Sequence, residues 1–318
     1  MSLIEQAYAL ANRGNAAGAI SMLEDGGRAG QADCWVELAA WHLSGQIVPR
    51  DLAKSREYFR LAADLGHEQA RDIYVALLAN GTGGSADWAG AIKVLSETAG
   101  SDPNSARELD VIRAMNVGPA GEPLGPFPCE QLSASPDVRL FPGLFSAEEC
   151  DWLVERSSPS LQPSLVVDPR SGQQVPNPVR TSDAVGFPLI IESPAIHALC
   201  RRLAAASGTQ VKDGEPLQVL RYRPGQQYRP HFDAIDNADN QRVLTFLVYL
   251  NDDYEGGETE FLTTGLKVKG KKGDGLLFRN ADSSRAPDPA SHHAGLAVTA
   301  GEKFLASRWI RERQFTPS

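Results

Sequence analysis

Four residues in the last third of the chain have side chains suited to binding a metal ion or an anion: His231, Asp233, His293 and Lys303. In an extended segment, residues two apart project from the same face, so His231 and Asp233 are expected to lie together, with Phe232 pointing away into packing. Two imidazoles and one carboxylate can occupy one face of an octahedral Fe(II) and leave three positions open for a co-substrate and oxygen. A histidine and an aspartate at this spacing are weak evidence by themselves, so the elements around them decide the interpretation.

Composition limits the classes of protein to consider. The 318 residues suffice for two domains, and 40 acidic against 31 basic residues argue against a nucleic-acid binder, which normally carries a basic surface. No Cys-x-x-Cys pair occurs, which indicates neither a zinc site nor a disulfide framework, so a reducing compartment is expected. We find no secretory signal pattern and no stretch of roughly 20 apolar residues, and therefore expect a cytoplasmic protein without membrane association.

Residues 1–115 repeat with a period of 36. Asn15, Asp51 and Asp87 are one period apart, each placed to cap a helix, and Gly45 and Gly81 precede the two aspartates at the same spacing. This pattern resembles the tetratricopeptide superfamily, particularly its Sel-like branch, and predicts an α-helical solenoid. Such repeats imply a concave surface that docks a partner protein or a peptide or protein substrate. The alternatives are an array that only packs on the second domain, or one that makes a homodimer.

After residue 115 the helical repeat pattern ends and the residue composition changes. Seven of eleven residues from Gly118 to Pro128 are Gly or Pro, which predicts a linker, assigned to residues 116–136. From residue 137 to 318 we expect one domain, opening with a short helix capped by Ser146 and Glu149. It continues with short β-rich runs at Leu217–Tyr222, Val243–Leu250, Leu266–Phe278 and Lys303–Arg311. Many short strands with frequent turns favour a sandwich or jelly roll.

The second domain also carries a series of motifs in a defined order. They are Arg180-Thr-Ser182, Tyr222-Arg-Pro-Gly225, Arg242-Val-Leu-Thr245 leading to Tyr249-Leu-Asn251, Gly256-Gly-Glu-Thr259-Glu-Phe261, Lys272-Gly-Asp-Gly-Leu-Leu-Phe278, Ser291-His-His293-Ala-Gly295 and Trp309-Ile-Arg311. In this order and spacing the domain resembles the prolyl 4-hydroxylase family of Fe(II)/2-oxoglutarate dioxygenases. The resemblance implies a double-stranded β-helix (jelly-roll) oxygenase domain.

The resemblance also implies roles for individual residues. His292 and His293 point to opposite faces of a strand, and the family pattern selects His293 as the distal ligand beside His231 and Asp233, with His292 as the alternative. Lys303 would anchor the far carboxylate of 2-oxoglutarate, and strand alternation places Leu305, Ser307, Trp309 and Arg311 on its face. Tyr222 and Thr245 would hydrogen-bond 2-oxoglutarate, while Tyr228, Arg242 and Trp309 would line the substrate side.

By the same resemblance the enzyme would use Fe(II), 2-oxoglutarate and O2, with ascorbate as a reductant, and would release succinate and CO2. The expected substrate is a prolyl residue in a peptide or protein. The alternatives are a free amino acid, a non-prolyl residue, or a binding scaffold with a vestigial oxygenase fold. Leu262, Gly270 and Ala297 replace prolines usual in the family, and residues 279–291 are expected to form a flexible lip over the site.

Overall fold

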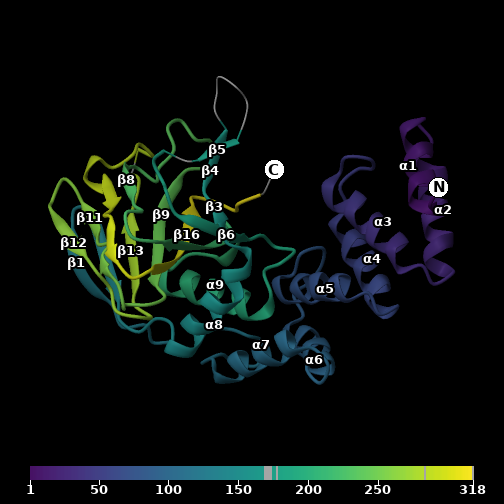
Figure 1. The fold of residues 1–318 in the computed structure, drawn as a ribbon, viewed down its shortest axis with the longest axis horizontal. Coiled ribbons are helices and arrows are strands. Elements are labelled where there is room, and N and C mark those ends of the chain that lie inside the picture. Colours follow the sequence, from purple (N-terminus) through teal and green to yellow (C-terminus); the bar gives the residue numbers. More distant parts are fainter. Residues whose placement is uncertain (168–173, 177, 283, 317–318) are drawn as a thin grey trace. The chain divides into compact units, whose positions relative to one another are not determined.

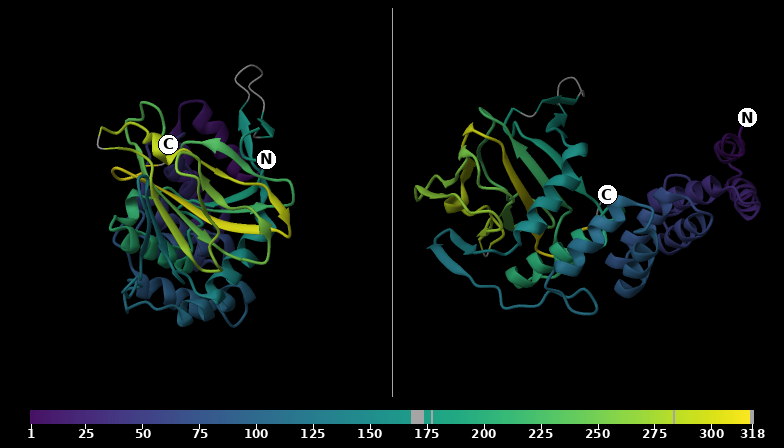
Figure 2. Two further views of the ribbon diagram at one scale, coloured as in Figure 1. Left: turned by 90° about the vertical axis from the view of Figure 1, so that its left-hand side faces the viewer. Right: turned by 60° about the horizontal axis from the view of Figure 1, so that its bottom comes forward.

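The computed structural model describes residues 1–167, 174–176, 178–282 and 284–316. The chain forms two compact units (Figures 1 and 2). The helical unit comprises Met1–Arg113 with Pro119–Gly121 and Pro188–His197, and the β unit comprises the remainder. This confirms the predicted order of an α-helical repeat region followed by a β-rich domain. Among the described residues, no helix has the length and apolar character needed to cross a membrane.

The helical unit is built from antiparallel helix pairs whose ends follow the 36-residue period. Asn15, Asp51 and Asp87 each accept a hydrogen bond from the backbone N–H three residues on, at 3.0, 3.0 and 2.8 Å. Gly45 and Gly81 end the preceding helices with φ of 71° and 76°, a left-handed conformation that favours glycine. The helices are α1 (Leu3–Asn12), α2 (Ala16–Arg28), α3 (Ala32–Ser44), α4 (Leu52–Asp64), α5 (Glu68–Asn80), α6 (Trp88–Thr98) and α7 (Pro103–Ala114).

Small residues allow these helices to pack closely. A Cβ on Gly27 would lie 2.2 Å from the Trp35 ring, so α2 can approach α3 only with glycine at that position. The Ser55 hydroxyl is buried and donates to the Ala39 carbonyl at 2.9 Å where α3 and α4 cross. The repeat period therefore reflects both capping and the space that helix crossings require.

The β unit holds two antiparallel sheets that enclose an apolar core. Among the described residues, the larger has eight strands in the order β1-β2-β13-β9-β16-β7-β6-β3, and the smaller has four in the order β12-β11-β14-β8. Side chains of both sheets share one buried cluster that includes Tyr222, Leu247, Phe261 and Phe278. The strands of the larger sheet are β1 (Glu130–Ala134), β2 (Asp137–Phe141), β3 (Gln162–Pro163), β6 (Asp183–Phe187), β7 (Leu217–Tyr222), β9 (Arg242–Tyr249), β13 (Gly275–Arg279) and β16 (Lys303–Arg311).

The smaller sheet and two strand pairs complete the β unit. The strands of the smaller sheet are β8 (Tyr228–His231), β11 (Thr259–Phe261), β12 (Leu266–Val268) and β14 (His293–Gly295). The pairs are β4 (Leu165–Val167) with β5 (Gln174–Pro176), and β10 (Glu255–Gly256) with β15 (Val298–Ala300).

Strand register brings the predicted site residues together. His231 at the end of β8 is the direct cross-strand partner of His293 at the start of β14. On the larger sheet, Lys303 pairs with Tyr222, and six residues along β16 Trp309 pairs with Thr245. Residues far apart in the sequence therefore meet in one region between the sheets.

The structure differs from the predicted organisation in two places. The segment assigned to the linker, 116–136, contains β1, which pairs with β2 and so belongs to the larger sheet. β1 is an edge strand with no fully buried residue, and so it lacks the apolar alternation that would have revealed it. The expected run Leu266–Phe278 is two strands, because a turn before Gly275 moves the chain from the smaller sheet to the larger.

Within the β unit, a buried ion pair joins one helix to the part of a second helix that begins at Ala198. Ser146 and Glu149 form the predicted capping box at the start of α8 (Ala147–Ser157). The Glu149 carboxylate also accepts two hydrogen bonds, at 2.6 and 2.7 Å, from Arg202 of α9 (Pro194–Ser207). Arg202 donates further to the Leu144 carbonyl at 3.0 Å. One carboxylate thus caps one helix and holds a second against it.

Replacing Glu149 by Ala is expected to lower the free energy of unfolding of the β unit by about 3–5 kcal/mol, because Arg202 would keep a buried charge without its partner. The matched control is Arg139→Ala, which breaks a pair with Asp137 in which the arginine is 45% exposed, and should cost at most about 1 kcal/mol. Urea unfolding followed by circular dichroism measures both. Equal losses for the two variants would contradict a special role for the buried pair.

Candidate active site

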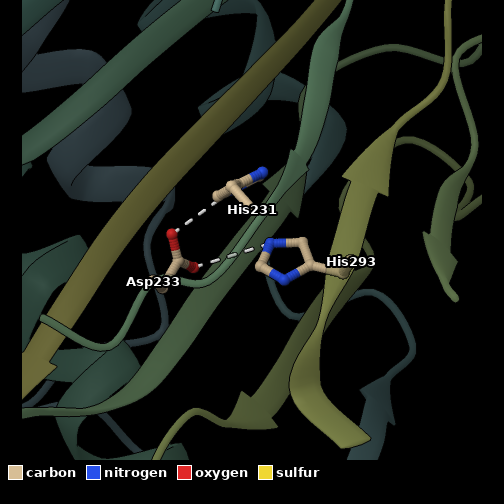
Figure 3. Close-up of side chains that lie close together, drawn as sticks. All are labelled: His231, Asp233 and His293. Carbon is tan, nitrogen blue, oxygen red and sulfur yellow. Dashed lines mark ion pairs between the residues drawn. The ribbon is translucent and has the colours of Figure 1, made fainter. Parts of the chain in front are cut away.

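His231, Asp233 and His293 form a compact cluster of ligand atoms (Figure 3). One nitrogen or oxygen from each lies within 4.8 Å of the other two. The Nε2 atoms of His231 and His293 lie 3.5 and 3.7 Å from the two oxygens of Asp233. Asp233 and His293 are both only 4% exposed, so the cluster is largely shielded from water.

Hydrogen bonds determine which nitrogen of each imidazole carries the proton. Nδ1 of His231 lies 2.7 Å from the Arg229 carbonyl, and Nδ1 of His293 lies 2.9 Å from the Ser291 carbonyl. A carbonyl only accepts, so each Nδ1 is the donor and each Nε2 presents a lone pair. Nε2 of His231 is buried without a hydrogen-bond partner. Two imidazole nitrogens with available lone pairs and a buried carboxylate are a donor set that suits a divalent metal, so the residues fit an Fe(II) ion.

The charge states also suit a metal. Burial lowers the pKa of His293 to about 4, so this ring is neutral at physiological pH. Burial alone would raise the pKa of Asp233, but the two imidazoles and the Thr245 hydroxyl hold it below its usual value. At neutral pH the cluster therefore offers the neutral imidazole of His293 and the carboxylate of Asp233 beside the His231 ring.

The neighbouring residues Phe232 and His292 lie outside this cluster. Their rings stack on each other with centroids 4.6 Å apart. The expectation that Phe232 points into packing is wrong, since it is 41% exposed. His292, the alternative distal ligand, thus faces away from Asp233, in keeping with the alternation of side chains along a strand.

The cluster opens into a pocket that Lys303 enters from the opposite sheet. Lys303 is 3% exposed, and its Nζ donates to the Gly257 carbonyl at 2.7 Å. Burial lowers the pKa of this ammonium group to about 8. Lys303, Leu305, Ser307 and Trp309 line the pocket, as the alternation predicted for β16. Arg311, predicted on the same face, does not line it, because the register shifts between Ile310 and Arg311 and the guanidinium group pairs with Glu215 at 2.6 Å. The other lining residues are Arg180, Leu220, Tyr222, Tyr228, His231, Asp233, Leu247, Thr259, His293, Gly295 and Leu296.

Comparison of the sequence with known proteins identifies the family of this chain. The sequence profile of the 2OG-Fe(II) oxygenase superfamily matches residues 217–311. Prolyl 4-hydroxylase 1 of Arabidopsis thaliana is 36% identical over 226 residues, which cover 65% of this chain and 76% of that protein. The chain belongs to the prolyl 4-hydroxylase family of 2OG-Fe(II) oxygenases. It is a 2-oxoglutarate-dependent dioxygenase, of a family that uses Fe(II), 2-oxoglutarate and O2.

Other similar proteins include prolyl 4-hydroxylase 2 of Arabidopsis thaliana, 33% identical over 60% of this chain and 73% of that protein. Among solved structures, the 2OG complex of a viral collagen prolyl hydroxylase from Paramecium Bursaria Chlorella virus-1 aligns with a TM-score of 0.44 at 31% identity. That alignment covers 55% of this chain and 95% of the viral one. A Sel1 repeat protein from Oxalobacter formigenes aligns with a TM-score of 0.29 at 18% identity, over 36% and 48% of the two chains.

The two residues expected to hydrogen-bond 2-oxoglutarate, Tyr222 and Thr245, lie differently with respect to the pocket. Tyr222 lines it, but Thr245 does not. Its hydroxyl donates to Oδ2 of Asp233 at 2.5 Å. Thr259 lines the pocket instead, with its hydroxyl 3.3 Å from that of Tyr249, whose ring also lies beside Lys303. Sequence reasoning gave Thr259 no role, although the Gly-Gly-Glu-Thr motif that contains it was part of the resemblance.

The residues predicted for the substrate side also separate into two groups. Tyr228 and Trp309 line the pocket, and Tyr228 stacks on His231 with ring centroids 3.5 Å apart. Arg242 is absent from the lining. It lies 3.7 Å over the Trp309 ring and donates to both oxygens of the buried Glu215 at 2.6 and 2.9 Å. Arg242 therefore supports the pocket wall from behind.

The expected lip, residues 279–291, is held at several points; Ser283 lies outside the described residues. Arg285 pairs with Glu312 at 3.0 Å, and its carbonyl accepts a hydrogen bond from Gln241 at 3.2 Å. Gln241 also donates to the Ile235 carbonyl at 2.8 Å. A single buried amide thus connects this segment to the loop after Asp233.

Replacing Thr259 by Val should weaken 2-oxoglutarate binding by about tenfold at saturating metal, because a hydrogen bond to a charged group contributes roughly 1.5 kcal/mol or more. Thr245→Val is the matched control and should leave this affinity within about twofold under the same condition. Isothermal titration without oxygen measures both. A larger loss for Thr245→Val would restore the original expectation.

Proposed function

We propose that this dioxygenase hydroxylates a prolyl residue in a peptide or protein, converting 2-oxoglutarate and O2 to succinate and CO2. The observation that carries the proposal is the pocket that joins the cluster of His231, Asp233 and His293 to the buried Lys303. The names of the Arabidopsis relatives support the choice of proline.

We assign Fe(II) binding to the Nε2 atoms of His231 and His293 and to the carboxylate of Asp233. Fe(II) bound there would supply the redox chemistry that couples decarboxylation of 2-oxoglutarate to hydroxylation of a C–H bond. The protein holds both imidazoles in the required tautomer through backbone carbonyls, and Tyr228 covers one face of the His231 ring.

Lys303 is assigned to the far carboxylate of 2-oxoglutarate. An unpaired carboxylate would be costly in this largely apolar pocket, and a buried ammonium group offsets that cost. Its Nζ lies within 5.4 to 6.0 Å of the ring centroids of Tyr222, Tyr249 and Tyr254, so its charge is held among aromatic faces. Tyr222 and Thr259 would add hydrogen bonds from the pocket wall.

We assign the substrate side to Tyr228 and Trp309, whose rings provide apolar walls for a pyrrolidine ring. Arg242 and Glu215 would act by holding Trp309 in place.

The helical unit is proposed to help dock the substrate, with a homodimer as the alternative role. Glu37 accepts hydrogen bonds from the Tyr8 hydroxyl at 2.5 Å and from Trp41 Nε1 at 2.7 Å, and Tyr8 is 38% exposed. A held carboxylate beside an exposed aromatic ring suits a peptide that carries basic residues. We propose residues 1–115 as the docking domain and residues 137–318, together with β1, as the catalytic domain. A cytoplasmic location and ascorbate as a reductant complete the proposal.

Incubation of the protein with Fe(II), 2-oxoglutarate and proline-rich peptides should yield succinate and an added oxygen on proline, measured by mass spectrometry. His293→Ala should lower succinate formation by at least about a hundredfold through loss of a metal ligand. The adjacent His292→Ala is the matched control and should retain activity within a fewfold. Loss of activity in His292→Ala but not in His293→Ala would contradict the assignment of the metal ligand. Oxygen added only to free proline would show that the substrate is the free amino acid and not a peptide.

The affinity for 2-oxoglutarate should depend on pH through Lys303. Because the pKa of this group is about 8, the ammonium form predominates below pH 8 and is lost as the pH rises through it, so binding should weaken from pH 7 to 9.5. Lys303→Met should bind roughly 10- to 150-fold more weakly at pH 7, the loss of about 1.5–3 kcal/mol, and with little pH dependence. Lys303→Arg keeps its charge and should also lose the pH dependence. A wild-type pH dependence that persists in Lys303→Met would exclude this group as its source.

A further inference from the structure

A buried chain of hydrogen bonds lies behind Asp233. Nδ2 of Asn280 donates to the Thr245 hydroxyl at 2.8 Å, and that hydroxyl donates to Oδ2 of Asp233 at 2.5 Å. Asn280, Thr245 and Asp233 are 0%, 1% and 4% exposed, so water does not compete for these contacts. Sequence reasoning gave Asn280 no role.

The chemistry of the three groups allows only one direction for this chain. The carboxylate of Asp233 can only accept, and the single hydroxyl proton of Thr245 is used on it. The Thr245 oxygen must therefore accept from Asn280, which requires the amide nitrogen to face it. An amide is needed at residue 280 because its neutral N–H can donate to the hydroxyl.

The backbone holds both supporting residues in place. Thr245 lies in the middle of β9, paired with Phe278 of β13 on one side and with Trp309 of β16 on the other. Asn280 follows β13, and its N–H donates to the Val243 carbonyl at 2.9 Å. Neither Asn280 nor Thr245 can move without disrupting the larger sheet.

Packing alone does not explain an asparagine at residue 280. Its Oδ1 is buried and has no hydrogen-bond partner. A half-satisfied buried amide costs free energy that a leucine of similar size would not. The hydrogen bond from its Nδ2 to the Thr245 hydroxyl gives a reason for an asparagine at this position despite that cost.

We propose that Asn280 is a positioning residue that acts through Thr245 to set the rotation of the Asp233 carboxylate. With Oδ2 engaged by Thr245, Oδ1 is the oxygen without a hydroxyl partner, 3.5 Å from Nε2 of His231. The chain thereby selects which oxygen meets the metal. This inference rests on the proposed metal site, and it places Thr245 in metal binding, where the family resemblance had suggested a contact with 2-oxoglutarate.

The test is titration of the full chain with Co(II), used as a redox-stable substitute for Fe(II), without 2-oxoglutarate. Asn280→Leu and Thr245→Val should each weaken Co(II) binding by about 10- to 100-fold, the usual effect of removing the partner of a metal ligand. Both should shift the visible absorption band of bound Co(II). Thr245→Ser keeps the hydroxyl and should bind within about threefold of the wild type.

The double variant separates positioning from a general structural effect. Because Asn280 acts only through Thr245, adding Asn280→Leu to Thr245→Val should change Co(II) affinity by less than about twofold. If Asn280→Leu does not fold, as judged by circular dichroism of the metal-free protein, Asn280→Ala takes its place in the same cycle. Wild-type affinity in the Asn280 variant, or losses that multiply in the double variant, would overturn the inference. A wild-type chain that binds no Co(II) would instead refute the proposed metal site, and the inference with it.

Discussion

The active site depends on one of the buried negative charges of the β unit, the carboxylate of Asp233. A carboxylate removed from water needs compensating partners, and the fold supplies them from two sheets. His231 and His293 approach from the smaller sheet, while Thr245 approaches from the larger one. The two imidazoles direct nitrogen lone pairs toward the carboxylate, and the Thr245 hydroxyl donates a hydrogen bond to it. A cation bound between the carboxylate and the imidazoles would balance the negative charge.

Strand register fixes the relative positions of the residues around Asp233. The two histidines are cross-strand partners, so a single pairing between β8 and β14 sets their separation. On the larger sheet, β9 lies between β13 and β16 and brings Thr245 beside Asn280 and Trp309. Rigid sheets are more precise supports for a reactive site than loops, because each residue is held by neighbours on both sides.

Much of this could be predicted from the sequence. The period of 36 located the helix caps, and the spacing of His231 and Asp233 placed these two side chains together, because both patterns follow directly from backbone geometry. The third member of the cluster, His293, came from the family resemblance. The choice between Thr245 and Thr259 could not be predicted, since both threonines lie on strands and only the packing of the two sheets decides which hydroxyl meets the pocket. Arg242 was misplaced for a related reason, as its partner Glu215 is 27 residues away in the sequence. The edge strand β1 was missed because its exposure removes the apolar signal.

One strand, β16, carries both ends of the pocket. Lys303 and Trp309 are six residues apart, roughly 20 Å along an extended strand, and both face the same side. The length of the strand therefore fixes the distance between Lys303, at the anion-binding end, and Trp309, in the aromatic wall. An insertion or deletion of one residue between them would turn one of these side chains away from the pocket, so the length of this segment is under a stricter constraint than the identity of most residues within it.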